Sequence, residues 1–188
     1  MSSGLPRRRA LLPLPATARD RAPSGSWLHV SRRAMGCEVV FTVPDEDGAS
    51  LADLRAGLDE IEALEQRLSL YRPTSELCQL NATAGTEPVE VSETLAAVLG
   101  LALDLAEETA DAFDPTRGRR RHLDLDRARR TVRFSAPDVT LDFGAIGKGF
   151  ALDRAADVLR ARGVRRALLT AGTSSVRALG VGPAGGFF

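Results

Sequence analysis

Residues 142–153 read DFGAIGKGFALD and place three glycines and a lysine between two aspartates. Lys148 is the only lysine of the 188-residue chain, which otherwise relies on arginine for positive charge. The glycines allow a tight turn with close backbone approach. The residues after them predict a helix from about 149 to 162 that ends at Gly163, a residue type suited to the left-handed helix end. The stretch therefore predicts a strand, a glycine-rich turn and a helix in succession.

Backbone N–H groups in such a turn can bind an anion, since the helix dipole adds partial positive charge at the N-terminus. Lys148 would add a full charge, and an ammonium suits a single phosphate oxygen. The spacing matches neither a Walker loop, which has a longer gap before Gly-Lys and then Ser or Thr, nor GxGxxG. The residues alone leave two interpretations open: a diphosphate-binding turn, or a plain strand-to-helix turn with an exposed lysine.

Hydrophobic spacing predicts two further helices. Ser50 and Asp53 form a capping-box pattern before a helix over 51–68. Its expected core face consists of Leu51, Leu54, Leu58, Ile61, Leu64 and Leu68. The second helix runs from about 92 to 110, and a short helical turn is expected around 75–80. The core face of the second helix consists of Leu95, Val98, Leu99, Ala102 and Ala106.

Strands are expected where β-branched and aromatic residues alternate with polar ones. These segments are 37–43, 131–135, 139–143, 165–171 and 176–181. The second and third of them read as a hairpin joined by Ala-Pro-Asp. Helices, a hairpin and then strand-turn-helix-strand predict an α+β fold, with packed helices on a mixed sheet.

The bulk composition suits one soluble globular domain, with 44% hydrophobic and 27% charged residues. The 25 Lys and Arg residues balance the 25 Asp and Glu residues, so no global charge favours a nucleic-acid or membrane-surface partner. Eight arginines lie between 117 and 133. Because aromatic stacking residues are missing there, a solvated basic turn between strands is favoured over a phosphate or nucleic-acid site.

Residues 1–27, rich in Pro, Ser, Arg and Gly, are expected to be a disordered leader before a folded domain at 28–188. No apolar run approaches the ~20 residues of a membrane span. Arginines at 7–9 and a short apolar run resemble a signal peptide, but two prolines break that run. Cys37 and Cys78 are too few for a disulfide scaffold and read as buried thiols. These features together predict a cytoplasmic protein.

The motif at 142–153 resembles the central motif of the FAD:protein FMN transferase (ApbE) family. The family pattern is Asp-hydrophobic-Gly-(Gly/Ala)-Ile-(Gly/Ala)-Lys-Gly-Tyr-Ala-x-Asp, and only Phe150 departs from it, in place of tyrosine. Three further segments agree in order and spacing: AMG at 34–36, LSLYRPTSELCQLN at 68–81 and AFDPTRG at 112–118. The resemblance covers about residues 34–182.

This resemblance implies an enzyme that uses Mg²⁺ to transfer FMN from FAD, through its phosphate, to a threonine of a target flavoprotein, with release of AMP. The residues that match FAD-contacting positions are Met35, Tyr71, Ala112, Phe113, Asp114, Asp142 and Lys148. Ala145 matches the position whose backbone carbonyl binds Mg²⁺. Taken without the family, Met35 reads as a core residue, Tyr71 as a surface aromatic and FDPT as a helix stop.

Four further residues match family positions and are expected either to contact the site residues or to be structural: Ser69, Ser75, Asn81 and Asp153, of which Asp153 is also compatible with a cap or a pair within its own helix. The chain departs from the family after Thr116, where the usual Gly-Pro-Leu and a longer insertion give way to the arginine-rich link. The family also continues beyond the strand at 176–181 with segments that complete its metal site. The resemblance therefore implies a chain truncated at its C-terminus.

Three hypotheses follow. The first is a Mg²⁺-dependent flavin transferase. The second is a catalytically incomplete flavin-binding relative or fragment, or an FAD pyrophosphatase. The third, from a different class, is a small nucleotide-binding or kinase-like domain that uses the Gly-Lys turn. The absence of Ser or Thr after Lys148 weighs against the third.

Overall fold

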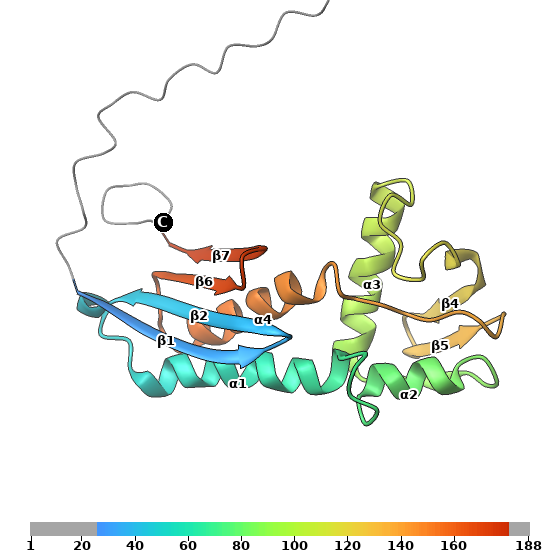
Figure 1. Ribbon diagram of the computed structural model, residues 1–188, viewed down its shortest axis with the longest axis horizontal. Helices are drawn as coiled ribbons and strands as arrows, with labels where there is room; N and C mark the ends of the chain where they lie inside the picture. The colour runs from blue at the N-terminus through green and yellow to red at the C-terminus, as the bar shows by residue number, and fades with distance from the viewer. Residues whose placement is uncertain (1–25, 181–188) are drawn as a thin grey trace, which may run out of the picture.

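The computed structural model describes residues 26–180, whose helices and strands form two lobes that lie side by side (Figure 1). The predicted leader, residues 1–27, lies outside the described residues except for Ser26 and Trp27. Trp27 already belongs to the first strand. None of the described helices is long and apolar enough to cross a bilayer.

In the part of the chain that the structure describes, the first lobe is a four-stranded antiparallel sheet with two helices packed against it (Figure 1). Its strands lie in the order β1-β2-β6-β7. Their bounds are β1 Trp27–Ala34, β2 Cys37–Pro44, β6 Ala167–Ala171 and β7 Ser175–Leu179. The helices α1 (Leu51–Leu68) and α4 (Gly147–Ala161) pack against each other and against this sheet. A short 3-10 turn, η2 (Asp45–Asp47), joins β2 to α1.

The second lobe contains α2 (Glu76–Thr83), α3 (Glu93–Glu108) and a small antiparallel sheet in the order β3-β5-β4. The bounds of its strands and of the 3-10 turn before β4 are β3 Val89–Glu90, β4 Leu123–Asp126, β5 Thr131–Phe134 and η3 Arg120–His122. The chain crosses into this lobe between α1 and α2, and it returns through the segment that precedes α4 (Figure 1). Helices and sheets together confirm the predicted α+β class, although the described strands pair only antiparallel and not in the mixed arrangement that was expected.

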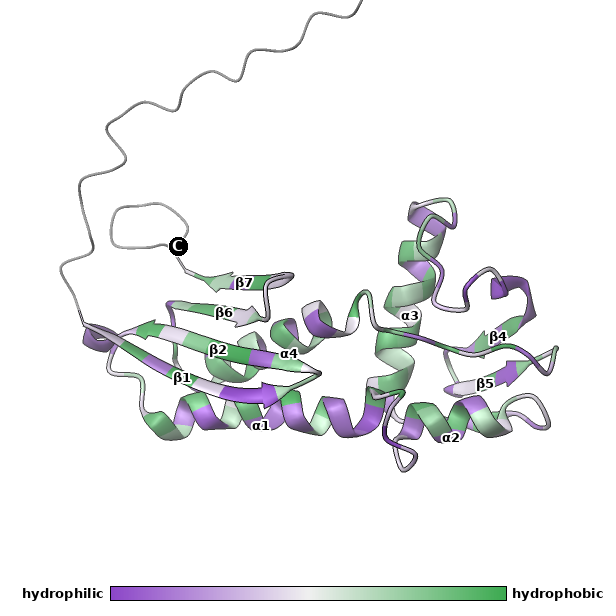
Figure 2. Ribbon diagram, viewed as in Figure 1, coloured by the Kyte–Doolittle hydropathy of each residue, from purple (hydrophilic) through white to green (hydrophobic). Residues whose placement is uncertain are grey.

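The predicted capping box and helix over 51–68 are confirmed as α1. The Ser50 hydroxyl accepts a hydrogen bond from the Asp53 amide, and the Asp53 carboxylate accepts one from the Ser50 amide. The predicted core face is buried except at Leu51, which is 48% exposed. That part of the prediction is wrong, because Leu51 is the first residue of the helix, where the stripe extends past the core. In Figure 2 hydrophobic and hydrophilic residues alternate along α1, as a helix with one buried face requires.

The predicted hairpin of 131–135 with 139–143 is wrong. Strand β5 pairs with β3 and β4, and residues 139–143 form no strand. Their alternation is nevertheless real, since the side chains of Val139, Leu141 and Phe143 are buried. The segment is extended, but no neighbouring strand pairs with it. Its backbone groups bond instead to the side-chain amide of Asn81 and to the Pro115 carbonyl.

Three strands lie where none was predicted: β1, β3 and β4. Strand β1 pairs with β2 along its whole length, from Trp27 opposite Pro44 to Ala34 opposite Cys37. It forms an edge of the sheet and carries polar residues on its exposed face, so it lacks the apolar signal of a central strand. Strand β4 lies inside the arginine-rich link, and its Leu-Asp-Leu-Asp alternation covers only four residues, which is a weak strand signal. The turn expected at 75–80 is the longer helix α2.

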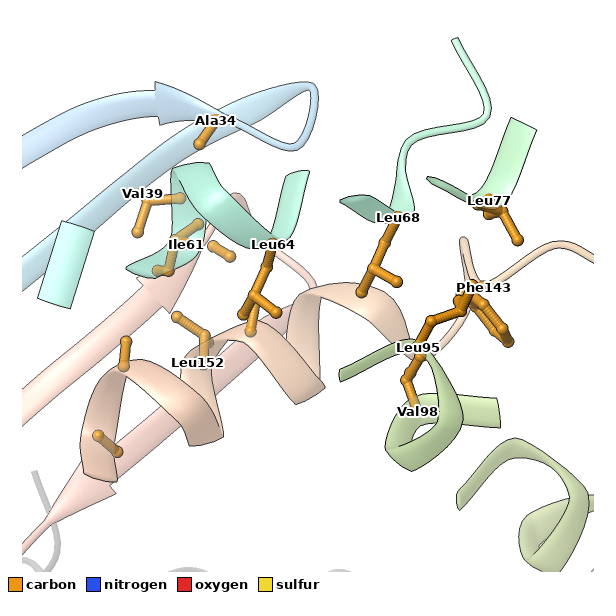
Figure 3. Packing of buried hydrophobic residues seen from close by; sticks show 14 of the residues in the cluster. Ala34, Val39, Ile61, Leu64, Leu68, Leu77, Leu95, Val98, Phe143 and Leu152 are labelled. Atoms are coloured by element: carbon orange, nitrogen blue, oxygen red, sulfur yellow. The ribbon is translucent and has the colours of Figure 1, made fainter. Parts of the chain in front are cut away.

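One hydrophobic core runs through both lobes. Figure 3 shows its side chains from Val39, Ile61 and Leu152 in the first lobe to Leu95 and Leu77 in the second. Phe143, which follows Asp142, is 2% exposed and belongs to the same cluster. The segment that leads back to α4 is therefore anchored in the core beside the glycine turn.

Candidate functional site

A cavity of about 270 Å³ lies where the chain passes between the two lobes. One wall is the tip of the β1–β2 hairpin, Met35 and Gly36. A second consists of Glu65 and residues 68–71 at the end of α1, and the third consists of Asp142, Phe143, Gly144, Gly147 and Lys148. The fold thus brings together four of the predicted site residues, which come from three distant parts of the sequence: Met35, Tyr71, Asp142 and Lys148.

Met35 occupies an unusual backbone conformation. Its φ angle is 52° and that of Gly36 is 72°, which a two-residue hairpin turn of the primed type requires at both central positions. Glycine adopts this region freely, whereas a long side chain there costs about 1–2 kcal/mol. A Cβ placed on Gly147 would lie 3.6 Å from the Met35 Cε, so the methionine reaches over the first turn of α4. Strain of this kind persists where packing or function requires the side chain.

The glycine turn leaves amide groups free at the start of α4. The Ile146 and Gly147 amides both donate to the Phe143 carbonyl, at 3.1 and 2.6 Å. Helix α4 begins at Gly147, two residues before the predicted start, and no side chain caps it at Ile146. Within residues 26–180 the Lys148 and Gly149 amides have no hydrogen-bond acceptor. These donors and the helix dipole are the parts of the anion site that the glycines predict.

Asn81 fixes the segment that enters this turn. Its side-chain amide donates to the Leu141 carbonyl at 3.0 Å, and its oxygen accepts from the Leu141 amide at 2.8 Å. These two bonds imitate a strand pairing. The next amide, that of Asp142, donates to the Pro115 carbonyl at 2.8 Å. Asp142 is therefore held from both sides, by Asn81 through the neighbouring Leu141 and by the loop that carries Pro115.

The Asp142 carboxylate is engaged at both oxygens. Oδ1 accepts a hydrogen bond from the Gly144 amide at 2.8 Å, which closes the turn. Oδ2 accepts from the guanidinium of Arg117 at 2.5 Å. Arg117 has a φ angle of 54°, and Gly118 after it has 90°. A left-handed bend in the 112–118 segment thus directs an arginine to the edge of the cavity.

Tyr71 stands at the rim with 95% of its surface exposed. Its loop is nonetheless ordered by hydrogen bonds. The buried Ser75 hydroxyl donates to the Ser69 carbonyl at 2.6 Å, and the Tyr71 amide donates to the Ser69 hydroxyl at 3.1 Å. The Cys78 thiol also donates to the Ser69 carbonyl, at 3.4 Å. An aromatic ring held at a cavity mouth has apolar area that a planar ligand could cover.

Ala112, Phe113 and Asp114 do not line this cavity. Ala112 is exposed, and Phe113 packs against the core. Burial alone would raise the pKa of Asp114, but hydrogen bonds from Thr116, Gly118 and Arg120 outweigh it and hold the pKa below its usual value. Asp114 thus closes its own loop, beside a separate cavity of about 480 Å³. The segment reaches the site through the Pro115 carbonyl and Arg117.

Ala145 is exposed at the turn but lies outside the cavity wall. Mg²⁺ prefers octahedral oxygen coordination, and a single carbonyl supplies one ligand. No group of three or more His, Cys, Asp or Glu side chains in residues 26–180 could hold a metal ion. The described residues therefore do not make a magnesium site by themselves.

Sequence reasoning missed Glu65, which lines the cavity, and the arginines that pair with the cavity carboxylates, Arg72 and Arg117. Glu65 is one of several charged residues on α1, and neither its type nor its spacing distinguishes it from the others. Arg117 is one of eight arginines in its link, and nothing in the letters distinguishes it. Gly118 was the available signal of a tight turn, because glycine adopts the left-handed region readily.

The comparisons with known proteins point to one family. The model of the ApbE family matches residues 35–186. The FAD:protein FMN transferase of Treponema pallidum (strain Nichols) is 31% identical over 167 residues, which cover 69% of this chain and 46% of that protein. The FAD:protein FMN transferase of Escherichia coli (strain K12) is 22% identical over 192 residues, and this match covers 81% of this chain and 55% of that protein. The chain spans about half the length of the curated relatives it matches.

Solved structures share the fold. The flavin transferase ApbE of Vibrio cholerae superimposes with a TM-score of 0.76 at 23% identity, covering 86% of this chain and 62% of that one. The ApbE protein of Thermotoga maritima gives a TM-score of 0.72 at 23% identity, covering 83% and 60%. The matched residues include all three walls of the cavity. The chain belongs to the ApbE family.

Proposed function

We propose that this chain carries the FAD-binding part of an FAD:protein FMN transferase. The observation that carries the proposal is the cavity in which Met35, Tyr71, Asp142 and Lys148 meet beside the free amides of α4. Family membership and the name of the Treponema pallidum relative support the same activity.

Each wall of the cavity has a distinct part in this proposal. The apolar side chain of Met35 and the exposed ring of Tyr71 contact the isoalloxazine, which is planar and largely apolar. The Lys148 and Gly149 amides and the Lys148 ammonium bind the diphosphate, because backbone donors at a helix N-terminus favour negative charge. Asp142 accepts a hydrogen bond from the cofactor while the Gly144 amide keeps its carboxylate in place.

The proposed reaction is a phosphoryl-group transfer. The acceptor threonine oxygen forms a bond to the phosphorus of the FMN half, the P–O–P bridge breaks, and its oxygen leaves with AMP. The hydroxyl proton is lost, and none of residues 26–180 is assigned to remove it. Bound Mg²⁺ would neutralise charge on the diphosphate. Of the described residues we assign only the Ala145 carbonyl to that ion.

The first test measures FAD binding by the purified chain, with the change in flavin fluorescence as the readout. Lys148→Ala should weaken FAD binding by about 10- to 100-fold, since a hydrogen bond to a charged group contributes roughly 1.5–3 kcal/mol. Arg129→Ala is the matched control, because Arg129 is an exposed cation of β4–β5 that lies outside the cavity. Equal FAD affinity of wild type and Lys148→Ala would refute the diphosphate role.

The second test adds Mg²⁺ and a threonine-containing acceptor peptide and measures products by mass spectrometry. Transferase activity predicts a peptide that carries FMN, together with AMP. FAD binding with no AMP would favour the second hypothesis, a flavin-binding relative or fragment. AMP and free FMN without labelled peptide would indicate an FAD pyrophosphatase.

A further inference from the structure

The charged side chains that line the cavity have the wrong balance for an anionic ligand. They are Glu65, Asp142 and Lys148, two carboxylates and one ammonium. Left alone, the two acids would outweigh the lysine. A diphosphate entering such a cavity would meet net negative charge, and like charges at close range repel.

Each of these carboxylates is paired with an arginine from outside the cavity wall. Asp142 Oδ2 lies 2.5 Å from a guanidinium nitrogen of Arg117, and Glu65 Oε2 lies 3.5 Å from one of Arg72. Both carboxylates are mostly covered, with side-chain exposures of 24% and 19%. Lys148 forms no ion pair with any residue of 26–180. Once the two pairs are formed, its charge is the one left uncompensated in the cavity.

The loop that carries Arg117 is built to hold it there. Asp114 closes that loop through the Thr116 and Gly118 amides, at 2.7 and 2.8 Å. Thr116 is buried at 2% exposure. The next residue, Arg117, bends into the left-handed region, and the Pro115 carbonyl of the same loop binds the Asp142 amide. Asp142 is thus joined to this loop twice, through the Pro115 carbonyl and through the Arg117 side chain.

We propose that Arg117 is a positioning residue that acts through Asp142. It neutralises and orients that carboxylate, so that Lys148 and the α4 amides present net positive charge to phosphate. Arg72 has the same effect on Glu65. The proposal rests on the proposed function and adds a specificity: Arg117 favours phosphorylated flavins over riboflavin, which shares the ring system but has no phosphate.

The test compares the affinities of riboflavin, FMN and FAD for wild type and Arg117→Gln. Loss of one exposed ion pair should weaken FMN and FAD binding by about three- to tenfold and leave riboflavin unchanged. Arg117→Lys should keep most of the phosphate preference. Arg129→Gln, which removes an arginine of the same link that lies outside the cavity, should change none of the three affinities.

Removal of both members of the pair sharpens the test. In the Arg117→Gln background, Asp142→Asn should restore the preference for FMN and FAD over riboflavin, because the amide keeps an oxygen for Gly144 without the negative charge. Asp142→Asn alone should strengthen FMN binding relative to riboflavin, which keeps the proposal testable if Arg117→Gln does not fold. Equal weakening of all three flavins by Arg117→Gln would mean a merely structural role and would overturn the inference. So would no weakening at all.

Inorganic pyrophosphate separates this inference from the proposed function. If wild type binds pyrophosphate but none of the flavins, the flavin assignment fails. The charge balance is then tested on pyrophosphate alone, where Arg117→Gln must again weaken binding. If wild type binds flavins and Arg117→Gln binds them equally well, the inference fails and the proposed function stands. If wild type binds neither flavin nor pyrophosphate, both are wrong.

Discussion

Replacing Asn81 with alanine should destabilise the protein and loosen the cavity together. The side chain makes two hydrogen bonds to the Leu141 backbone, at 3.0 and 2.8 Å. Leu141 is 0% exposed, so Asn81→Ala leaves its amide and carbonyl without these partners. Each lost bond costs about 1 kcal/mol, and a buried group left unpaired costs about 1–3 kcal/mol. We expect the free energy of unfolding to fall by about 2–4 kcal/mol.

Urea denaturation followed by circular dichroism would measure this loss. Thr83→Ala is the matched control, since it lies on the same helix and removes a single exposed bond, from the Thr83 hydroxyl to the Gln79 carbonyl. That control should change stability by no more than about 0.5 kcal/mol. Asn81→Ala should also weaken FAD binding, because Asp142 follows Leu141 directly. A stability loss equal to that of the control would show that the 139–143 segment is held by its buried side chains alone.

Three further predictions concern packing, helix capping and pH. Gly57→Ala should lower the free energy of unfolding by about 1–2 kcal/mol, because the new Cβ would lie 2.8 Å from Phe41 Cε2. In the same thermal melts Gly149→Ala should raise the free energy of unfolding, because its Cβ meets open space and alanine favours the helix. Glu76→Ala should destabilise by about 1–2 kcal/mol in urea titrations, because the Glu76 carboxylate accepts from the Ser92 amide and hydroxyl, at 2.5 and 2.7 Å, where α3 begins. The pKa of Asp114 is lowered in the folded state, so its carboxylate stabilises the fold above the unfolded pKa of about 3.9 and loses that effect as the pH falls through the lower folded pKa. Asp114→Asn should therefore be less stable than wild type at neutral pH and equally stable at the acid end, and a stability gap that stays constant with pH would contradict this.

The elements that the sequence predicts well are those with strong local signals. Helices α1 and α3 follow from leucine spacing and, for α1, from the capping pattern of Ser50 and Asp53, because each signal lies within one turn of its effect. The 139–143 hairpin was wrongly predicted because a period of two reports which side chains are buried and not what binds the backbone. The side chain of Asn81, 60 residues away, supplies that partner.

The candidate site likewise contains residues that the sequence indicates and residues that it does not. The unusual position of Lys148 is visible in the sequence, and the structure leaves it without an acidic partner among the described residues. Met35 and Tyr71 were identified through the family resemblance, since nothing local distinguishes them from a core methionine and a surface tyrosine. Arg117 was missed because its importance comes from a left-handed backbone angle and from a distant carboxylate, neither of which spacing reveals.

Within residues 26–180 the chain passes between the lobes twice, before α2 and before α4, and both passages help to line the cavity. Any bending of one lobe against the other must therefore change the shape of that cavity. A molecule bound there would contact both passages and restrict the motion of one lobe against the other. Occupancy and rigidity would then rise together, and the melting temperature of the whole chain would report on ligand concentration.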